Sequence, residues 1–303
     1  MKRREGYKGL VGFHHSTDWH RSDLEVILDR YIVSEIEEML HYFSGSYKSF
    51  FKTFLMAYEI SDIGLILRGI TNNEDMRSIE SLLIHSKKWE SINPQKLMAC
   101  KNVPQFIETL KGSPYYVVLK TMTQEDLAKR AFHMEMKLYM LFYSELIERA
   151  SHLNAKDKEI AKQFIGTKID FLNTQWIYRA LKYYDLSPEE ILIYSIPNGN
   201  RLGYRKLKIL SYTKDINEFK KLAEKYLAYP LFKDNSDAYL DCYTERYLDQ
   251  LITKMNKDDE SIASSITYLY KLEIEIKDLV SLTEGIRYTL SEPELSKFLV
   301  HTI

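Results

Sequence analysis

The sequence predicts an all-α protein, and three observations lead to this fold class. Only 11 glycines and 7 prolines occur among 303 residues, so few positions favour hairpin turns or long irregular loops. Apolar residues recur about every 3.6 positions, as in LEVILDRYIVSEIEEMLHYF from Leu24, which is the period of an amphipathic helix. Finally, one helical motif recurs at intervals of about a third of the chain. A helical protein built from repeated units follows.

Helix starts are predicted where a small polar residue is followed three positions later by an acid. This pattern occurs at five pairs, which are Ser22/Glu25, Thr123/Asp126, Ser187/Glu190, Asp215/Glu218 and Ser291/Glu294. Loops are expected around Pro94, around Pro114 and from Ser195 to Tyr204, where proline, asparagine and glycine cluster. The GNRLG stretch of the last loop lacks the glycine spacing and the Lys-Ser/Thr pair of a phosphate-binding loop.

The charge balance excludes a strong overall attraction to nucleic acid or to an anionic membrane. Lysine and arginine number 42 and the acids 43, which gives a net charge of -1. Cys100 and Cys242 are too far apart for a disulfide framework or a zinc site and suit a reducing compartment. With no signal peptide and no uncharged apolar run of membrane-spanning length, we expect a soluble, cytoplasmic protein.

The repeated motif is an acid, a second polar residue three positions later and a charged residue after nine. Its three copies are Glu59, Asp62 and Arg68; Asp170, Asn173 and Arg179; and Glu275 and Asp278, with Glu284 in place of the arginine. The first acids of successive copies lie 111 and 105 residues apart. We therefore predict three helical repeats, at 1–120 with a divergent N-terminal segment, at 121–232, and at 233–303. The third is truncated, and the N-terminal segment is a candidate to complete it.

The first acid of each copy falls on the packing face of its helix, among isoleucines, leucines and aromatic residues. A buried carboxylate must accept hydrogen bonds, here expected from a facing arginine, tyrosine or helix N-terminus. Arg68 and Arg179 lie about half a turn from that acid, so they are expected to reach a neighbouring helix or solvent. Acid/base catalysis by Glu59, Asp170 and Glu275 is the alternative, but a threefold recurrence favours a structural role.

A metal site is weighed at FHHSTDWH, which contains His14, His15, Asp18 and His20. These side chains bind zinc or iron, but adjacent histidines suit one metal poorly and no second ligand cluster follows. A solvated loop is the favoured interpretation, so neither a metal nor a cofactor is expected. A metal-dependent enzyme that uses these histidines is the least favoured of three functional hypotheses.

Three segments carry a resemblance to a known family. They are FLMAYEISDIGLILRGI, IGTKIDFLNTQWIYRALKYYDLSPEEILIYSIPNGNRL and YLYKLEIEIKDLVSLTEGIRYTL. From about residue 36 the chain resembles the C subunit of the V/A-type ATPases, which is the family of the eukaryotic V-ATPase d subunit. GLVGFHHSTDWHRSD does not resemble the opening helix of the family, the chain is short for the family, and Glu284 departs from its arginine.

This resemblance implies three similar helical domains arranged as a funnel with pseudo-threefold symmetry. Such a protein sits peripherally on the cytoplasmic side of the cell membrane, on the rotor ring of c/K subunits, and receives the D and F subunits of the central stalk. It transmits torque for proton or sodium ion transport and has no active site, no nucleic acid partner and no membrane span of its own. The alternative is an all-helical scaffold for other protein partners, although repeats of this length exceed the roughly 20–50 residues of ordinary solenoids.

Overall fold

The computed structural model describes residues 21–122, 131–184, 186–233, 237–256 and 261–301, and every regular element in these ranges is a helix. The all-α prediction is confirmed. The helices are α2 Arg21–Met39, α3 Gly45–Thr53, α4 Met56–Asn72, α5 Met76–Leu82, α6 Pro94–Met98, α7 Val103–Thr109, α8 Pro114–Leu119, α10 Ala131–Ser151, α11 Ala155–Tyr183, α12 Pro188–Ile193, α13 Tyr204–Tyr212, α14 Ile216–Leu227, α15 Leu240–Met255, α16 Ala263–Arg287 and α17 Glu292–Leu295.

The predicted starts of α12, α14 and α17 are confirmed. Ser187 and Ser291 each form a capping box with the glutamate three positions later, and Asp215 accepts hydrogen bonds from the first main-chain N–H groups of α14. The start at Ser22 stays a prediction, because the described part of the chain begins at Arg21, one residue before it. Arg21 Nε lies 2.8 Å from Glu25 Oε1, an ion pair across one turn that favours the helix at this end. Thr123 lies outside the described residues.

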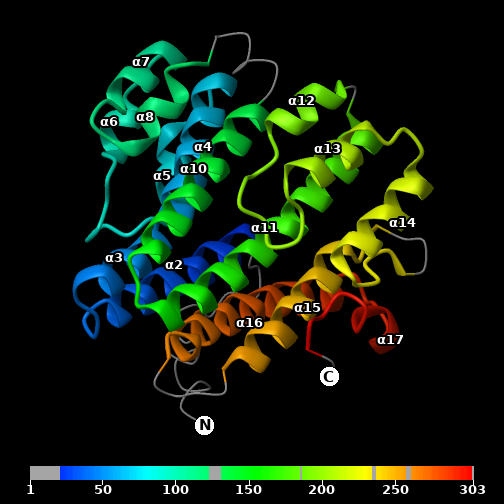
Figure 1. Cartoon of the computed structure of the whole chain (residues 1–303). Helices are drawn as coiled ribbons and strands as arrows, with labels where there is room; N and C mark the ends of the chain where they lie inside the picture. Colours follow the sequence, from blue (N-terminus) through cyan, green and yellow to red (C-terminus); the bar gives the residue numbers. More distant parts are fainter. Residues whose placement is uncertain (1–20, 123–130, 185, 234–236, 257–260, 302–303) are drawn as a thin grey trace.

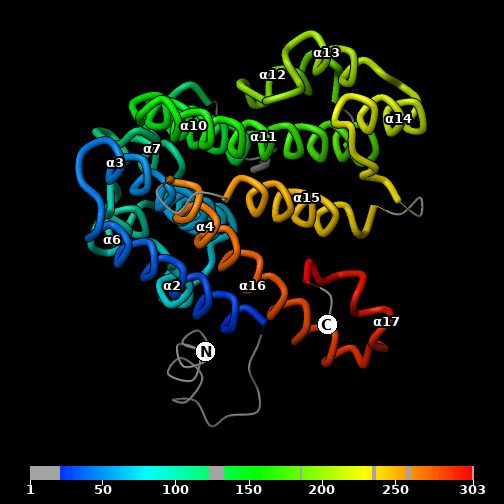
Figure 2. Tube along the Cα trace, turned by 60° about the horizontal axis from the view of Figure 1, so that its bottom comes forward, coloured from blue at the N-terminus to red at the C-terminus, as the bar shows by residue number. Residues whose placement is uncertain are grey.

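The long helices pack side by side in a closed circuit (Figures 1 and 2). Helix α10 packs against α11, α11 against α15, and α15 against α16, and α16 in turn packs against α2. Helices α3 and α4 pack against α10, and α3 also contacts α2. The first and last long helices are thus neighbours although more than 200 residues separate them.

The short helices lie on the outside of this circuit. Helices α5, α6 and α7 pack against α4, whereas α13 and α14 pack against α11. Helix α17 packs against α16. One cluster of buried apolar side chains joins the long helices to most of the short ones, although Leu295 of α17 is buried outside it.

No helix in the described ranges has both the length and the apolar character needed to cross a bilayer. Helix α11 is long enough at 29 residues, but Lys168, Asp170 and Arg179 interrupt its apolar residues.

Candidate functional site

Asp62, the second residue of the first motif copy, fastens the loop that follows α5. Its carboxylate accepts hydrogen bonds from the main-chain N–H groups of Ile84 at 3.0 Å and His85 at 2.9 Å. It also lies 2.6 Å from Nδ1 of His85. Burial acts to lower the pKa of His85, but the hydrogen bond to Asp62 and the nearby charge of Glu90 leave it raised. Asp62 is therefore fully paired inside the fold.

The second residues of the other two copies hold equivalent loops. Asn173 accepts the N–H of Ile196 at 2.7 Å and donates to the carbonyl of the same residue at 2.8 Å. Asp278 accepts the main-chain N–H groups of Val300 at 2.7 Å and His301 at 3.1 Å. In all three copies the partner lies 22 or 23 residues after the motif residue. The recurrence in the sequence is accompanied by a recurring set of contacts.

The first acids of two copies hold a second, later loop. Glu59 accepts hydrogen bonds at 2.5 Å from the N–H and the hydroxyl of Ser91 and from the hydroxyl of Tyr115. Asp170 accepts the N–H groups of Arg201 at 2.6 Å and Leu202 at 2.9 Å. Burial raises the pKa of Asp170 to about 6, and these N–H groups limit the rise. Tyr115 is a donor of the expected kind, but the loop N–H groups were not foreseen.

Glu275, the first acid of the third copy, is more exposed than Glu59 and Asp170. The third copy thus keeps the loop contacts of Asp278, while its first acid is less buried than those of the other two copies.

The third motif position does not serve one common role. Arg179 pairs with Asp241 of α15 at 3.1 Å, and both side chains are more than half exposed. Arg68 is exposed and makes no hydrogen bond or ion pair with any residue in the described ranges. Glu284 lies 3.7 Å from Arg287 on its own helix.

A small residue ten positions after the first acid is a further repeated feature, which the sequence reasoning missed. A Cβ at Gly69 would collide with the side chain of Ile79, and one at Gly285 would collide with that of Leu295. The second copy has a fully buried alanine, Ala180, at this position. Helices α5 and α17 can therefore approach the first and third motif helices closely. The shared small residue in RGI, RAL and EGI was the available signal.

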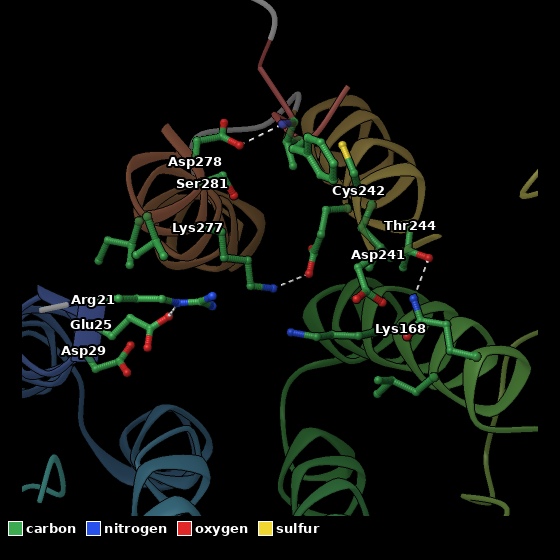
Figure 3. A pocket seen from close by; sticks show the side chains of 18 residues that line it. Arg21, Glu25, Asp29, Lys168, Asp241, Cys242, Thr244, Lys277, Asp278 and Ser281 are labelled. Atoms are coloured by element: carbon green, nitrogen blue, oxygen red, sulfur yellow. Dashed lines mark hydrogen bonds and ion pairs between the residues drawn. The ribbon is translucent and has the colours of Figure 1, made fainter. Parts of the chain in front are cut away.

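A hollow lies inside the circuit of long helices and is the candidate functional site. It consists of one cavity of about 520 Å³ between α2, α11, α15 and α16 and a second of about 320 Å³ that extends to α4 and α10. Asp29 and Lys168 line both cavities. Arg21, Lys168 and Lys277 reach toward the middle of the larger cavity from three different helices (Figure 3). Because each wall is a different long helix, the hollow depends on the closure of the circuit.

Two ion pairs fix the charges on the wall of the hollow. Lys168 Nζ lies 3.5 Å from Glu273 Oε2 of α16, and Lys277 of α16 pairs with Glu245 of α15. Burial acts to lower the pKa of Lys168, but Glu273 and Glu245 leave it raised. Burial acts to raise the pKa of Glu245, yet Lys277 and Lys168 hold it below its usual value. Lys168 and Glu245 therefore stay charged at neutral pH.

Asp29 differs from these paired groups, since it makes no hydrogen bond or ion pair within the described part of the chain. Burial, together with the nearby charges of Glu25 and Glu273, raises its pKa to about 6. Carboxylates also outnumber cations around the larger cavity, whose charged residues are Glu25, Asp29, Asp241, Glu245 and Asp278 against Arg21, Lys168 and Lys277. Such a wall is complementary to a partner that presents basic groups.

The described ranges offer no clustered metal ligands. They contain no group of three or more histidine, cysteine, aspartate or glutamate side chains that could hold a metal ion. His14, His15, Asp18 and His20 lie outside them. Cys242 lines the hollow, but burial raises the pKa of its thiol to about 11, which makes it a poor nucleophile at neutral pH.

Comparison with known proteins gives the family. The model of the ATP synthase (C/AC39) subunit family matches residues 3–298. The chain is 25% identical to the A-type ATP synthase C subunit of Methanosarcina mazei over 197 residues, which cover 65% of this chain and 54% of the relative. It is 24% identical to the Methanosarcina acetivorans protein of the same name over 280 residues (91% and 76%) and 25% identical to that of Archaeoglobus fulgidus over 261 residues (84% and 73%). The match thus spans about half the length of the first relative and about three quarters of the other two. Since the family model covers nearly all of the sequence, the resemblance is confirmed, and the chain belongs to the ATP synthase (C/AC39) subunit family.

Proposed function

We propose that this chain is a non-catalytic rotor subunit of a rotary ATPase. In this role it is a socket that joins the central stalk to the membrane rotor ring and transmits torque for proton or sodium ion transport. The proposal includes three helical domains at 1–120, 121–232 and 233–303, arranged as a funnel with pseudo-threefold symmetry. The recurring contacts of Asp62, Asn173 and Asp278 support this division.

The observation that carries the proposal is the hollow with its surplus of carboxylates. It opens between helices from all three proposed domains, and Asp29 supplies a carboxylate that no side chain in the described ranges pairs. A stalk foot with basic side chains would gain ion pairs there, in surroundings less polar than water, where charge pairs are stronger. The partners in this proposal are the D and F subunits of the stalk in the hollow and the c/K ring below, with the chain on the cytoplasmic side of the membrane.

Torque transmission also requires a stiff body, and the buried motif residues hold loops against the long helices. Asp62, Asp170 and Asn173 are each about 1% exposed or less, and each ties a loop to a long helix through main-chain groups. Buried polar contacts that are fully satisfied favour one packing arrangement over others. The motif is thus proposed to act mechanically.

Charge reversal in the hollow tests the proposal. The tagged chain, co-produced with the other ATP synthase subunits of its source, is expected to copurify with the stalk subunits and the ring. Asp29→Lys should lower recovery of the stalk subunits about tenfold while circular dichroism and the melting temperature show an intact fold. The matched control is Glu108→Lys, because Glu108 is 61% exposed on α7, outside the hollow. Wild-type recovery for both variants would overturn the role of the hollow, and a wild-type chain that recovers neither the stalk nor the ring would overturn the function.

A further inference from the structure

The second cavity of the hollow, the inner cavity, has walls made largely of aromatic side chains. Its volume of about 320 Å³ is near the lower end of the roughly 300–1,000 Å³ that small-molecule pockets occupy. The aromatic residues come from α4, α10, α11 and the segment that joins α3 to α4, and they are Phe54, Tyr58, Tyr139, Phe142, Tyr143 and Phe164. The inner cavity thus has the size and the lining of a site for a small ligand.

The charged residues of the inner cavity leave one negative charge without a partner. Asp29 and Lys168 line both cavities and lie on opposite walls of the larger one (Figure 3). The charge of Lys168 is balanced by Glu273, the third charged residue of the inner cavity, whose Oε2 lies 3.5 Å from the Lys168 Nζ. Asp29 has no such counterpart among the described residues, so the net charge of the inner cavity is on its carboxylate.

Three tyrosine hydroxyl groups in the same walls also make no hydrogen bond with any residue that the structure describes. They belong to Tyr58, Tyr139 and Tyr143, and Tyr143 is only 5% exposed. Burial raises the pKa of Tyr143 to about 12, and burial with the nearby charges of Glu273 and Asp29 raises that of Tyr58. Both hydroxyls therefore keep their protons. Because a buried hydroxyl without a hydrogen bond is unfavourable, these groups favour a ligand that carries a polar group.

The combination of groups in the inner cavity selects a cation. An anion would be repelled by Asp29, and a neutral apolar molecule would leave the carboxylate and the hydroxyls unpaired. A primary ammonium group has three N–H donors, which suit carboxylate and hydroxyl acceptors, and the faces of aromatic rings attract a cation. An attached alkyl chain would fill the apolar remainder of the cavity.

We infer that the inner cavity binds a primary ammonium group carried on an alkyl chain, with the nitrogen at Asp29 and the chain against the aromatic rings. This group occurs in a free alkylamine and in the side chain of a lysine from the stalk. Binding of a free amine is independent of the proposed function, whereas a stalk lysine as the source rests on it.

Isothermal titration calorimetry of the purified full chain with pentan-1-amine tests this inference. Pentan-1-ol is the matched neutral probe, because it has the same alkyl chain without the charge. At pH 7.5 the amine should bind about tenfold more tightly than the alcohol or better.

Three variants of the chain, each checked for its fold by circular dichroism, locate the binding. Asp29→Asn should weaken amine binding about tenfold. Tyr58→Phe removes one hydroxyl but keeps the ring, and should weaken it about fivefold. The matched control is Glu38→Gln, which removes a carboxylate that is 76% exposed on the same helix as Asp29 and should leave the affinity unchanged.

Equal binding of the amine and the alcohol, failure of the wild-type chain to bind the amine, or equal amine binding by the wild type and Asp29→Asn would overturn the inference. The same titration of the assembled complex distinguishes the two sources. The affinity for pentan-1-amine stays unchanged if the natural ligand is a free amine, and it falls about tenfold or more if a stalk lysine fills the cavity. A chain that binds the amine but assembles with neither stalk nor ring would refute the proposed function and leave this inference standing.

Discussion

Asp278 and His301 meet through two contacts. The carboxylate accepts the main-chain N–H of His301 at 3.1 Å and lies 2.9 Å from its Nδ1. The same two contacts join Asp62 to His85 at 2.9 and 2.6 Å, and in both cases the histidine follows the aspartate by 23 residues. The same pair of contacts between an aspartate and a histidine therefore occurs in the first and third copies of the motif. This shared pair is the strongest local evidence for the repeat.

Removing these contacts from the first copy should lower the free energy of unfolding. Asp62→Ala leaves the main-chain N–H groups of Ile84 and His85 without their acceptor, and Ile84 is buried. We expect a loss of about 2–4 kcal/mol in the free energy of unfolding, measured by urea denaturation. Arg68→Ala, six positions away on the same helix, should change it by no more than about 0.5 kcal/mol because Arg68 is exposed. Equal losses for the two variants would show that Asp62 has no special role in holding the loop.

Asn173 should not tolerate the aspartate that the other two copies carry. Its amide donates to the carbonyl of Ile196 as well as accepting the N–H of that residue, whereas an ionised carboxylate can only accept. Asn173→Asp is expected to cost about 2–3 kcal/mol at pH 7. Part of the loss should return at acid pH, where the carboxyl carries a proton that it can donate. Unfolding of the variant and of the wild type, compared at each pH, measures this, and a difference that does not change with pH would contradict it.

The small residues of the motif helices should be sensitive to one added methyl group. Gly69→Ala and Gly285→Ala place a Cβ against Ile79 and Leu295, so each is expected to lose about 1–3 kcal/mol. Gly64, also in α4, has no atom within 4 Å of an added Cβ. Gly64→Ala should instead stabilise by about 0.5–1 kcal/mol, because alanine favours a helix interior. Melting temperatures that move in the same direction for Gly64→Ala and Gly69→Ala would refute the close approach of α5.

Asp29 should make stability depend on pH. Its folded-state pKa of about 6 lies above the ordinary value of 3.8, so its contribution is fully present below about pH 4 and is lost as the pH rises through 6. Asp29→Asn cannot ionise. The variant should therefore be more stable than the wild type by about 1–2 kcal/mol at pH 7.5, with little difference at pH 4. A constant difference in melting temperature from pH 4 to 7.5 would contradict the raised pKa.

The helical class and several helix starts could be predicted because they depend on neighbouring residues. Ser187 and Ser291 cap helices through contacts that span three positions, and the motif acids lie at fixed offsets within one helix. The donors for Asp170 could not be predicted, since they are main-chain N–H groups of Arg201 and Leu202 and any residue type can supply them.

The hollow could not be predicted from the sequence for a different reason. Its walls are set by the crossing of helices that are far apart in the chain, such as α2 and α16. Asp29 appears in the sequence as one of several acids in an amphipathic segment. Only the closure of the circuit places it beside Glu273 and Lys168.

The most direct test of the account is a crosslink from inside the hollow. Ser281 lines the larger cavity on α16. With p-benzoylphenylalanine in place of Ser281, irradiation of the purified complex should join the chain to a central-stalk subunit. An assembled complex in which position 281 reacts only within its own chain, or only with the ring, would contradict a socket for the stalk.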